Sequence, residues 1–181
     1  MQLFQLDGHC ALVTGASKGI GAGLARGLAE AGADLILLAR GQQDLEQVRD
    51  QLRDTGRQIE IVSVDLLETS GIAAAYADLV ERFTAPDILV NNAGMTRRGA
   101  AHEVELEDWQ QVLDLNLNAV FALSQAFARQ RIASGEPGKI INIGSLMSQT
   151  TRPNNAPYAA SKGGILLLTK ALSVDWAPHR I

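Results

Sequence analysis

Short apolar runs that alternate with longer amphipathic segments are the feature that most constrains this chain. Between the runs, apolar residues recur every three to four positions, which is typical of helices. Strands that alternate with helices form parallel sheets whose two faces are both covered by helices. The sequence therefore predicts one α/β domain over residues 1–181, a doubly wound parallel sheet with strands at 10–14, 34–39, 59–64, 87–90 and 139–143.

The segments between the runs predict the helices. In the first of them the apolar residues Ile20, Leu24, Leu28 and Ala31 keep a helical spacing. The longest carries Asn116 on its apolar stripe, where a buried amide is costly unless it is hydrogen-bonded. After the first helix, which ends near Gly32, the others are expected at about 44–53, 70–83, 105–131 and 157–176.

Composition narrows the kind of partner. The formal net charge is −4 and the chain has no basic run, which argues against nucleic acid or an anionic membrane surface and favours a small molecule. No leader-like start and no long apolar window is present, so the chain is expected to be a soluble cytoplasmic protein. A single cysteine, Cys10, and three scattered histidines predict neither a disulfide nor a metal site.

Polar and glycine-rich clusters follow five of the predicted strands, and ligands of open α/β sheets bind at that carboxyl edge. The clusters are 14–21, Arg40, Asp65, 91–94 and Ser145. In the first, glycines at 15, 19 and 21 allow a sharp turn in front of a helix N-terminus, which favours a phosphate. Their spacing, Gly-x-x-x-Gly-x-Gly, fits neither the general dinucleotide fingerprint nor the phosphate loop of nucleotide hydrolases.

Tyr158 and Lys162 form a candidate proton-transfer pair. On a helix they lie four residues apart and therefore project from one face. A neighbouring cation favours the phenolate form, so Tyr158 could act as a general acid or base. The alternative is an ordinary helix tyrosine beside a solvated lysine.

Several of these motifs together resemble the short-chain dehydrogenase/reductase family. They are Thr14-Gly-Ala-Ser-Lys-Gly-Ile-Gly21, Asn91-Asn-Ala-Gly94, Asn116, Ser145 and Tyr158-x-x-x-Lys162, in that family's order and through essentially the whole chain. The glycine spacing is the family's own variant. The interval of thirteen residues between Ser145 and Tyr158 is also the family's usual one.

The resemblance implies a Rossmann fold, a nicotinamide cofactor and hydride exchange between a carbonyl and an alcohol. Tyr158 would be the acid or base, and Lys162 would hold the cofactor ribose. Ser145 would donate a hydrogen bond to the substrate oxygen, with Ser148 as a less suitable competitor. Asn116 would bind a water in a proton relay that reaches Lys162, or else would be a core amide bonded only to neighbouring backbone.

The resemblance also implies the residues that contact the cofactor. A carboxylate at the end of the second strand would select a free ribose hydroxyl, but this chain has Arg40 there and Lys18 in the glycine loop. NADP(H) is therefore favoured, and NAD(H) stays an alternative. Asp65 would accept a bond from the adenine amino group. The expected cofactor set is Gly15, Ser17, Lys18, Gly19, Ile20, Gly21, Arg40, Asp65, Leu66, Asn92, Ala93, Gly94, Tyr158 and Lys162.

The substrate is less constrained. Polar residues in the loops near the expected centre, among them Arg97, Arg98 and Arg152, suit a hydroxylated or acidic substrate. The sequence around Ser145 and Tyr158 resembles the gluconate 5-dehydrogenase branch of the family. The 3-oxoacyl-[acyl-carrier-protein] reductase branch shares most of these motifs. A dinucleotide-binding protein without catalytic activity is the alternative from another class.

The resemblance also raises an expectation about extent and assembly. Family members continue through a sixth strand and a substrate-covering segment, so the chain is expected to be truncated before that strand and inactive by itself. Packing of the long helices 105–131 and 157–176 against copies of themselves would give a homodimer or homotetramer.

Overall fold

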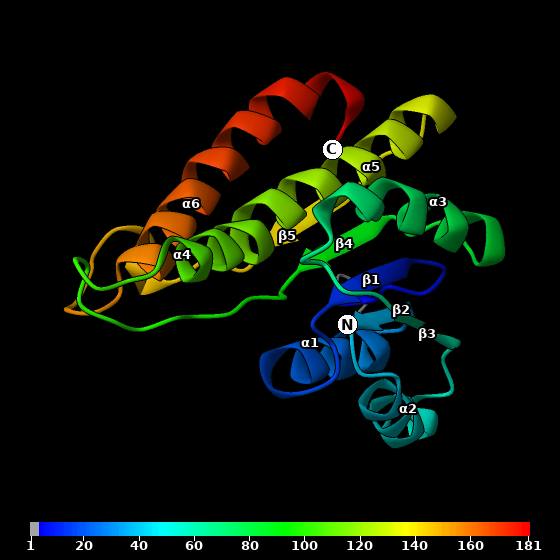
Figure 1. Cartoon of the computed structure of the whole chain (residues 1–181). Coiled ribbons are helices and arrows are strands. Elements are labelled where there is room, and N and C mark those ends of the chain that lie inside the picture. Colours follow the sequence, from blue (N-terminus) through cyan, green and yellow to red (C-terminus); the bar gives the residue numbers. More distant parts are fainter. Residues whose placement is uncertain (1–3) are drawn as a thin grey trace.

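The central sheet has five parallel strands. A computed structural model describes residues 4–181 and is drawn in Figure 1. The order across the sheet is β3-β2-β1-β4-β5, so the chain moves outward from β1 in one direction and then crosses back to continue on the other side. This is the predicted doubly wound, Rossmann-type arrangement. The strands are β1 (Cys10–Thr14), β2 (Asp34–Ala39), β3 (Ile59–Ser63), β4 (Ile88–Asn91) and β5 (Lys139–Asn142).

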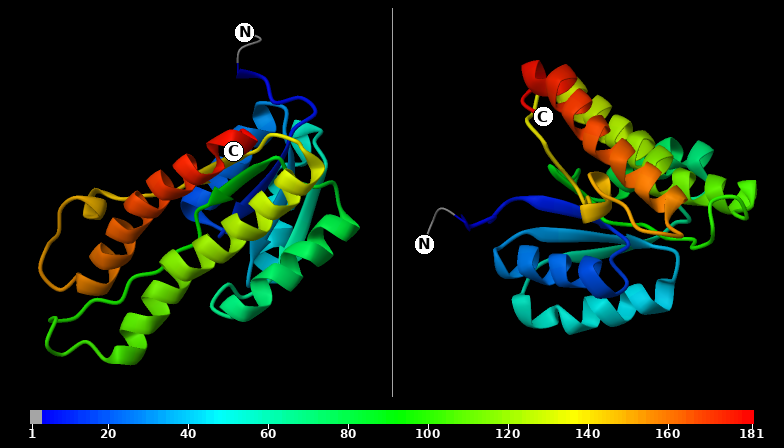
Figure 2. Two further views of the ribbon diagram at one scale, coloured as in Figure 1. Left: turned by 90° about the horizontal axis from the view of Figure 1, so that it is seen from above. Right: turned by 90° about the vertical axis from the view of Figure 1, so that its left-hand side faces the viewer.

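The helices lie in two layers, one on each face of the sheet. Figures 1 and 2 show one layer of two helices, α1 (Gly19–Glu30) and α2 (Gln42–Gln51), below the sheet. The opposite layer holds α3 (Ile72–Arg82), α4 (Leu106–Leu113), α5 (Ala119–Ser134) and α6 (Ala156–Trp176). Loops that leave the carboxyl ends of the strands therefore emerge together between the two layers.

Alternation along the strands divides the core into two clusters. In β1, Ala11 and Val13 face α1 and α2, whereas Cys10 and Leu12 face α3 and α5. Successive side chains of a strand point to opposite faces, and both faces are apolar because both are covered by helices. The predicted inward residues of α2 and α3, such as Val48 and Leu79, are buried.

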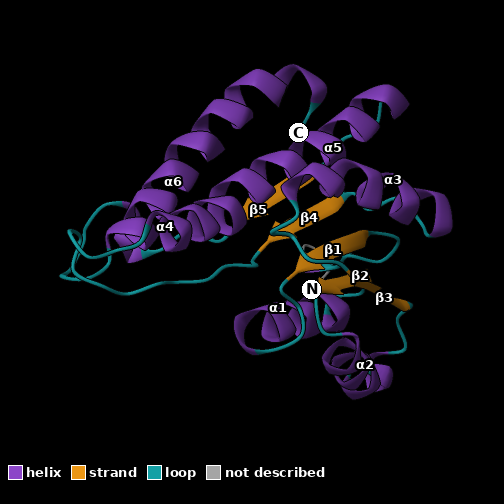
Figure 3. Cartoon of the chain, viewed as in Figure 1, coloured by secondary structure: helices purple, strands orange, loops and turns teal. Residues whose placement is uncertain are grey.

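The longest predicted helix is interrupted. The sequence predicts one helix over 105–131, but the structure has α4, a π-helical turn at Asp114–Asn118, and then α5. Figure 3 draws α4 and α5 in the colour of helices. The π turn is centred on Asn116, which is 1% exposed. Such turns insert an extra residue into a helix and are frequent at functional sites.

The predicted apolar stripe of α1 is wrong at its first residue. Ile20 is 68% exposed, and the buried residues are Gly21, Ala25 and Ala29. Small side chains allow α1 to approach the sheet closely, so the contact stripe follows the glycine and alanines. Ile20 instead faces the cavity described below.

Candidate active site

Thr14 and Asn92 tie the glycine loop to the loop after β4. The Thr14 hydroxyl accepts hydrogen bonds from the backbone N–H groups of Asn92 and Ala93, both at 3.0 Å. The Asn92 amide donates back to the carbonyl oxygens of Thr14 at 2.9 Å and Gly15 at 3.3 Å. These reciprocal bonds fix the two loops at the point where β1 and β4 are neighbours in the sheet.

Two glycines are required at this junction. Gly15 has a φ of +63°, which favours glycine, and a Cβ there would lie 2.9 Å from the Cα of Ala93. At Gly21 a Cβ would lie 2.2 Å from the carbonyl oxygen of Gly15. Gly19 is different, because its φ is +57° but no atom lies within 4 Å of a Cβ built there. The first two glycines therefore shape the loop, and the third leaves open space at the start of α1.

A cavity of about 980 Å³ opens in front of this loop. Its volume is that of a large ligand site. Eleven of the predicted cofactor residues line it, namely Gly15, Ser17, Lys18, Ile20, Gly21, Arg40, Asp65, Leu66, Asn92, Ala93 and Gly94. The predicted set also includes Gly19, Tyr158 and Lys162, which do not belong to its lining. The cavity has the glycine loop for a pyrophosphate and two cations at the β2 end, so these residues fit a dinucleotide.

Asn91, the first residue of the motif 91–94, does not belong to that lining. It is the last residue of β4 and is buried. Its amide donates to Ser124 at 3.0 Å and to Asn142 at 2.8 Å, and Asn142 in turn donates to Thr169 at 2.9 Å. These bonds join α5, β4, β5 and α6 below the site.

Other residues of the cavity were missed from the sequence. Gly41 and Asp44 come from the start of α2, while Gln111 and Leu115 come from α4 and the π turn. Arg97 also lines it, held by Asp108 of α4 at 3.1 Å. The helix period identifies inward residues but gives no sign of which outward residues meet a loop from elsewhere in the chain.

The two charged residues expected to contact the adenosine part lie side by side. A guanidinium nitrogen of Arg40 is 3.8 Å from a carboxylate oxygen of Asp65. Both side chains are largely exposed, so this pair adds at most about 1 kcal/mol to folding. The Asp65 carboxylate also accepts the backbone N–H of Leu67 at 3.0 Å.

Tyr158 and Lys162 do project from one face of α6. The ammonium nitrogen of Lys162 is 5.9 Å from the centre of the Tyr158 ring and donates to the carbonyl oxygen of Ile143 at 2.5 Å. Lys162 is 6% exposed, and its burial lowers its pKa. No carboxylate among residues 4–181 forms an ion pair with it. The cation is therefore fixed beside the phenol at the end of β5.

Asn116 joins the loop after β4 to α6. Its side-chain oxygen accepts the N–H of Met95 at 2.8 Å, and its amide donates to the Met95 carbonyl at 2.9 Å and to the Ser161 hydroxyl at 3.0 Å. Ser161 donates to the Tyr158 carbonyl at 2.8 Å. The buried amide is thereby satisfied, as the sequence requires. The water relay through Asn116 stays a prediction.

Ser145 begins a short 3-10 helix, Leu146–Ser148, that packs against α6. Its hydroxyl oxygen accepts the N–H of Met147 at 3.1 Å, and the Ser148 hydroxyl accepts the N–H of Ser145 at 3.2 Å. A hydroxyl that accepts one bond still has its hydrogen to donate. Ser145 can therefore donate to a substrate oxygen, and the Ser148 hydroxyl, which also accepts a single bond, keeps its hydrogen in the same way.

The loops after β4 and β5 meet near the start of α6. Both extend to the left of Figure 1, and the N–H of Gly99 donates to the carbonyl of Asn154 at 3.4 Å. Between them lies a hollow of about 250 Å³ lined by Arg98, Gly99, Arg152, Pro153 and Asn154. The adjacent arginines Arg97 and Arg98 thus face different spaces, and only Arg98 shares one with Arg152.

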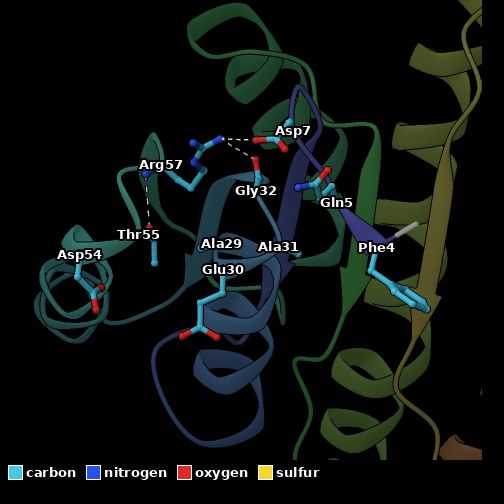
Figure 4. Close-up of a pocket in the computed structure, with 10 residues that line it drawn as sticks. All are labelled: Phe4, Gln5, Asp7, Ala29, Glu30, Ala31, Gly32, Asp54, Thr55 and Arg57. Atoms are coloured by element: carbon cyan, nitrogen blue, oxygen red, sulfur yellow. Dashed lines mark hydrogen bonds and ion pairs between the residues drawn. The ribbon is translucent and has the colours of Figure 1, made fainter. Parts of the chain in front are cut away.

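Another hollow, of about 490 Å³, lies at the opposite edge of the sheet (Figure 4). It is bordered by the segment before β1 and by the loops that lead into β2 and β3. Arg57 crosses it and donates to Asp7 at 3.2 Å and to the Gly32 carbonyl at 3.0 Å. Its polar groups therefore serve to join loops, and it is separate from the carboxyl-edge cavity.

Comparison with known proteins follows this geometry. A sequence model of the short chain dehydrogenase family matches residues 9–181. The chain belongs to the short-chain dehydrogenase/reductase family. It is accordingly an NAD(P)-dependent oxidoreductase.

Several relatives within the short-chain dehydrogenase/reductase family are named for activity on sugar acids. The chain is 42% identical to gluconate 5-dehydrogenase of Gluconobacter oxydans (strain 621H) over 98% of its own length and 69% of the relative. It is 40% identical to 2-dehydro-3-deoxy-D-gluconate 5-dehydrogenase of Escherichia coli (strain K12), over 100% and 71% of the two chains. The crystal structure of a gluconate 5-dehydrogenase from Burkholderia cenocepacia J2315 in complex with NADP and tartrate matches with a TM-score of 0.91 and 44% identity, over 97% and 69%.

Within residues 4–181 no group of three histidine, cysteine, aspartate or glutamate residues is placed to hold a metal ion. In the same part of the chain, no helix has the length and apolar character needed to cross a membrane.

Proposed function

We propose that this protein uses NADP(H) to interconvert a carbonyl and a secondary alcohol on a small sugar acid, such as 5-ketogluconate and gluconate. The observation that carries the proposal is one sheet edge where a cation-lined dinucleotide cavity lies next to a fixed tyrosine and lysine pair. Arg98 and Arg152, which face one hollow beside the catalytic helix, suit a substrate carboxylate.

The chemistry divides between cofactor and protein. Bound NADPH supplies a hydride to the carbonyl carbon. Tyr158 donates its phenolic proton to the carbonyl oxygen, which becomes the hydroxyl of the product, and the resulting phenolate is stabilised by the Lys162 ammonium. Ser145 donates a hydrogen bond to the same oxygen as negative charge develops there. Asn116 and Ser161 hold α6 against the loop after β4, so that Tyr158 keeps its position.

Replacement of Tyr158 tests the catalytic role. The Tyr158→Phe variant is expected to lose turnover by several orders of magnitude, because the phenol is the group that gives the proton in this mechanism. NADPH binding should be largely kept. The measurement is the oxidation of NADPH by the protein at its full natural length, followed by absorbance at 340 nm. A cofactor titration accompanies it. Equal turnover in both forms would overturn the mechanism, and a protein that only binds dinucleotide would show no turnover in either.

Cofactor preference is tested at Arg40. The Arg40→Asp variant is expected to bind NADPH much more weakly and NADH about equally well, since only NADPH carries the 2′-phosphate that a guanidinium would pair with. Fluorescence titrations with both cofactors measure this. A similar loss for both cofactors would show instead that Arg40 contacts a part of the dinucleotide that the two share.

The substrate is tested with a panel of sugar acids, keto acids and 3-oxoacyl thioesters in the presence of NADPH. Turnover restricted to sugar acids is expected from the two arginines and is consistent with the names of the relatives, one of which is bound to NADP and tartrate. Preference for a 3-oxoacyl thioester would identify the alternative, a 3-oxoacyl-[acyl-carrier-protein] reductase.

The assembly is proposed to be a homodimer or homotetramer. Apolar side chains on the outer faces of α5 and α6 support this, among them Phe121, Leu167 and Val174, which are exposed in one copy of the chain. Contacts through these helices would cover them.

A further inference from the structure

Charges of both signs surround the β2 end of the dinucleotide cavity. The lining holds three cations, Lys18, Arg40 and Arg97, and two carboxylates, Asp44 and Asp65. Asp65 is engaged by Arg40 and by the backbone N–H of Leu67. Asp44 has no role in the proposed function, which leaves a second negative charge beside the place where a 2′-phosphate would bind.

The start of α2 explains why Asp44 faces the cavity. The helix begins at Gln42 after Gly41, a capping residue that has no side chain to bond the first N–H groups. Asp44 is the third residue of the helix, and its carboxylate folds back toward Gly41. A Cβ built on Gly41 would lie 2.9 Å from an oxygen of Asp44. The carboxylate therefore lies at the helix N-terminus, beside Gly41, the residue that follows Arg40 in the chain.

A helix N-terminus and a guanidinium together attract anions. The 2′-phosphate of NADPH and the Asp44 carboxylate would occupy the same neighbourhood, and like charges at short range repel. NADH has a ribose hydroxyl at this place, which can donate a hydrogen bond to a carboxylate. The same side chain thus disfavours one cofactor without disfavouring the other.

We propose that Asp44 is a specificity-determining residue that weakens NADPH binding and keeps NADH usable. This inference rests on the proposed NADP(H) function. It means that the preference given by Lys18 and Arg40 is partly offset within the same cavity. The chain would then use both cofactors, with a preference that changes with ionic strength.

A structural role for Asp44 predicts different results. An acidic residue in the first turn interacts favourably with the helix dipole. If that were the whole role of Asp44, the residue would affect the stability of the fold and not cofactor choice. Removing it would then lower the melting temperature slightly and leave the ratio of the two cofactor affinities unchanged. The ratio, measured against salt, separates the two roles.

The experiment compares Asp44→Asn with the unsubstituted protein at its full natural length. Dissociation constants for NADPH and NADH are measured by fluorescence titration at low and at high salt. Asp50→Asn is the matched control, because it removes the same charge from the same helix at a residue that pairs with Arg53 and does not line the cavity. A second variant, Asp44→Glu, keeps the charge.

Asp44→Asn is expected to tighten NADPH binding about three- to tenfold at low salt and less at high salt, because salt screens charge repulsion. NADH binding should stay equal or weaken, and Asp50→Asn and Asp44→Glu should leave the NADPH constant within about twofold. An unchanged ratio of NADPH to NADH affinity in Asp44→Asn would overturn the inference while leaving the proposed function in place. Failure of the unsubstituted protein to bind NADPH would overturn the proposed function, and the inference with it.

Discussion

Gly21 lies where the first turn of α1 presses on the glycine loop. A Cβ there would come within 2.2 Å of the Gly15 carbonyl oxygen and 2.6 Å of the Asn92 amide nitrogen. Backbone atoms cannot yield as the tip of a flexible side chain can. The absence of a side chain at this one position therefore allows the loop, the helix and the β4 turn to meet.

Gly21→Ala is expected to destabilise the protein by about 3 kcal/mol and to weaken NADPH binding, because the loop must shift to admit the methyl group. Gly23→Ala is the control, since no atom lies within 4 Å of a Cβ built at Gly23 in the same helix. It should stabilise by about 0.5–1 kcal/mol. Urea denaturation and NADPH titration of both variants measure this, and equal stability of the two would contradict the geometry.

Cys10 is expected to make stability fall at alkaline pH. Burial, with nearby Asp87 and Asp34, raises the pKa of its thiol from 9.0 to about 12. The folded state keeps the proton while the unfolded chain loses it, so this contribution is complete below pH 9 and is lost as pH rises toward 12. The slope is at most about 1.4 kcal/mol per pH unit. Lys162 has the opposite effect on stability at alkaline pH. Its pKa is lowered in the folded state, so the folded state loses the proton first and stability rises as the pH increases.

Comparison with Cys10→Ala isolates the thiol from Lys162. At pH 7.5 the variant should be less stable by about 1–2 kcal/mol through lost packing. That difference should shrink above pH 9, since only the unsubstituted protein carries the thiol penalty. Chemical denaturation across this range is the measurement. Stability curves that stay parallel up to pH 10.5 would show that the thiol does not titrate as described.

Single positions also show what the sequence could reveal. The residue types of the glycine loop predicted a ligand cradle, and the cavity in front of it is present. Arg97 and Arg98 could not be separated, because neighbouring residues in an irregular loop have no period that assigns their directions. Ile20 was misplaced because an apolar residue at the end of a helix can complete a core or line a ligand cavity with the same spacing.

At the scale of elements, two adjacent glycines in α6 have opposite surroundings. A Cβ at Gly164 would lie 2.9 Å from a methyl group of Leu117 in the π turn, whereas one at Gly163 would lie 3.9 Å from the Ser148 carbonyl oxygen. Gly164 therefore allows α6 to approach the π turn closely.

The pair gives a prediction of opposite signs. Gly164→Ala is expected to destabilise by about 1–2 kcal/mol net of its gain in helix propensity, because Leu117 must move within a packed interface. Gly163→Ala should be neutral or stabilising by up to about 1 kcal/mol. Thermal unfolding of both variants is the measurement, and NADPH turnover checks that Tyr158 is undisturbed. A greater loss in Gly163→Ala than in Gly164→Ala would refute the packing of α6 on the π turn.

The π turn itself could not be predicted from the sequence. The apolar stripe over 105–131 reads as one helix, and the inward residues Val112, Val120, Leu123 and Phe127 are indeed buried. What the period cannot show is that one extra residue is accommodated around Asn116. The polar residue on the stripe was the only sign, and it indicated a need for partners without showing the backbone change that brings Met95 and Ser161 to it.

At the scale of the molecule, the alternation of strands and helices predicted the fold. That pattern predicted that the strands would be parallel and that helices would cover both faces of the sheet. It also predicted that the polar clusters would lie at one edge. The cavity wall formed by Gln111 and Leu115 did not, because it depends on how α4 lies over the loop after β4. The fold and the proximity of Tyr158 to Lys162 thus followed from spacing, whereas the shape of the ligand cavity depends on the packing of distant elements.

Association through α6 is expected at this scale. Leu167 and Val174 are 67% and 75% exposed and lie seven residues apart, so they share one face of the helix. Exposed apolar stripes of this kind favour contact with another copy. Leu167→Lys combined with Val174→Lys should reduce the mass seen by light scattering, because charges would be buried at the contact.

The control for association is Leu167→Ile, which keeps the proposed contact face apolar and should leave the mass unchanged. Circular dichroism checks that α6 remains folded in both variants. An unchanged mass in the double variant would assign the contact to another surface.

The central place of β1 sets an order of events as the chain folds. β1 and β2 are joined by one helix, but the pairing of β1 with β4 brings together residues such as Cys10 and Asp87, which are 77 residues apart in the chain. Closing so long a loop lowers the entropy of the chain before the new contacts can stabilise the pairing. Folds with such distant pairings therefore form slowly. During synthesis, β1 waits with one edge open until β4 leaves the ribosome. Thr14 and Asn92 can form their reciprocal bonds only then, so the nucleotide cradle is completed only after β4 has been made, well after its own glycines.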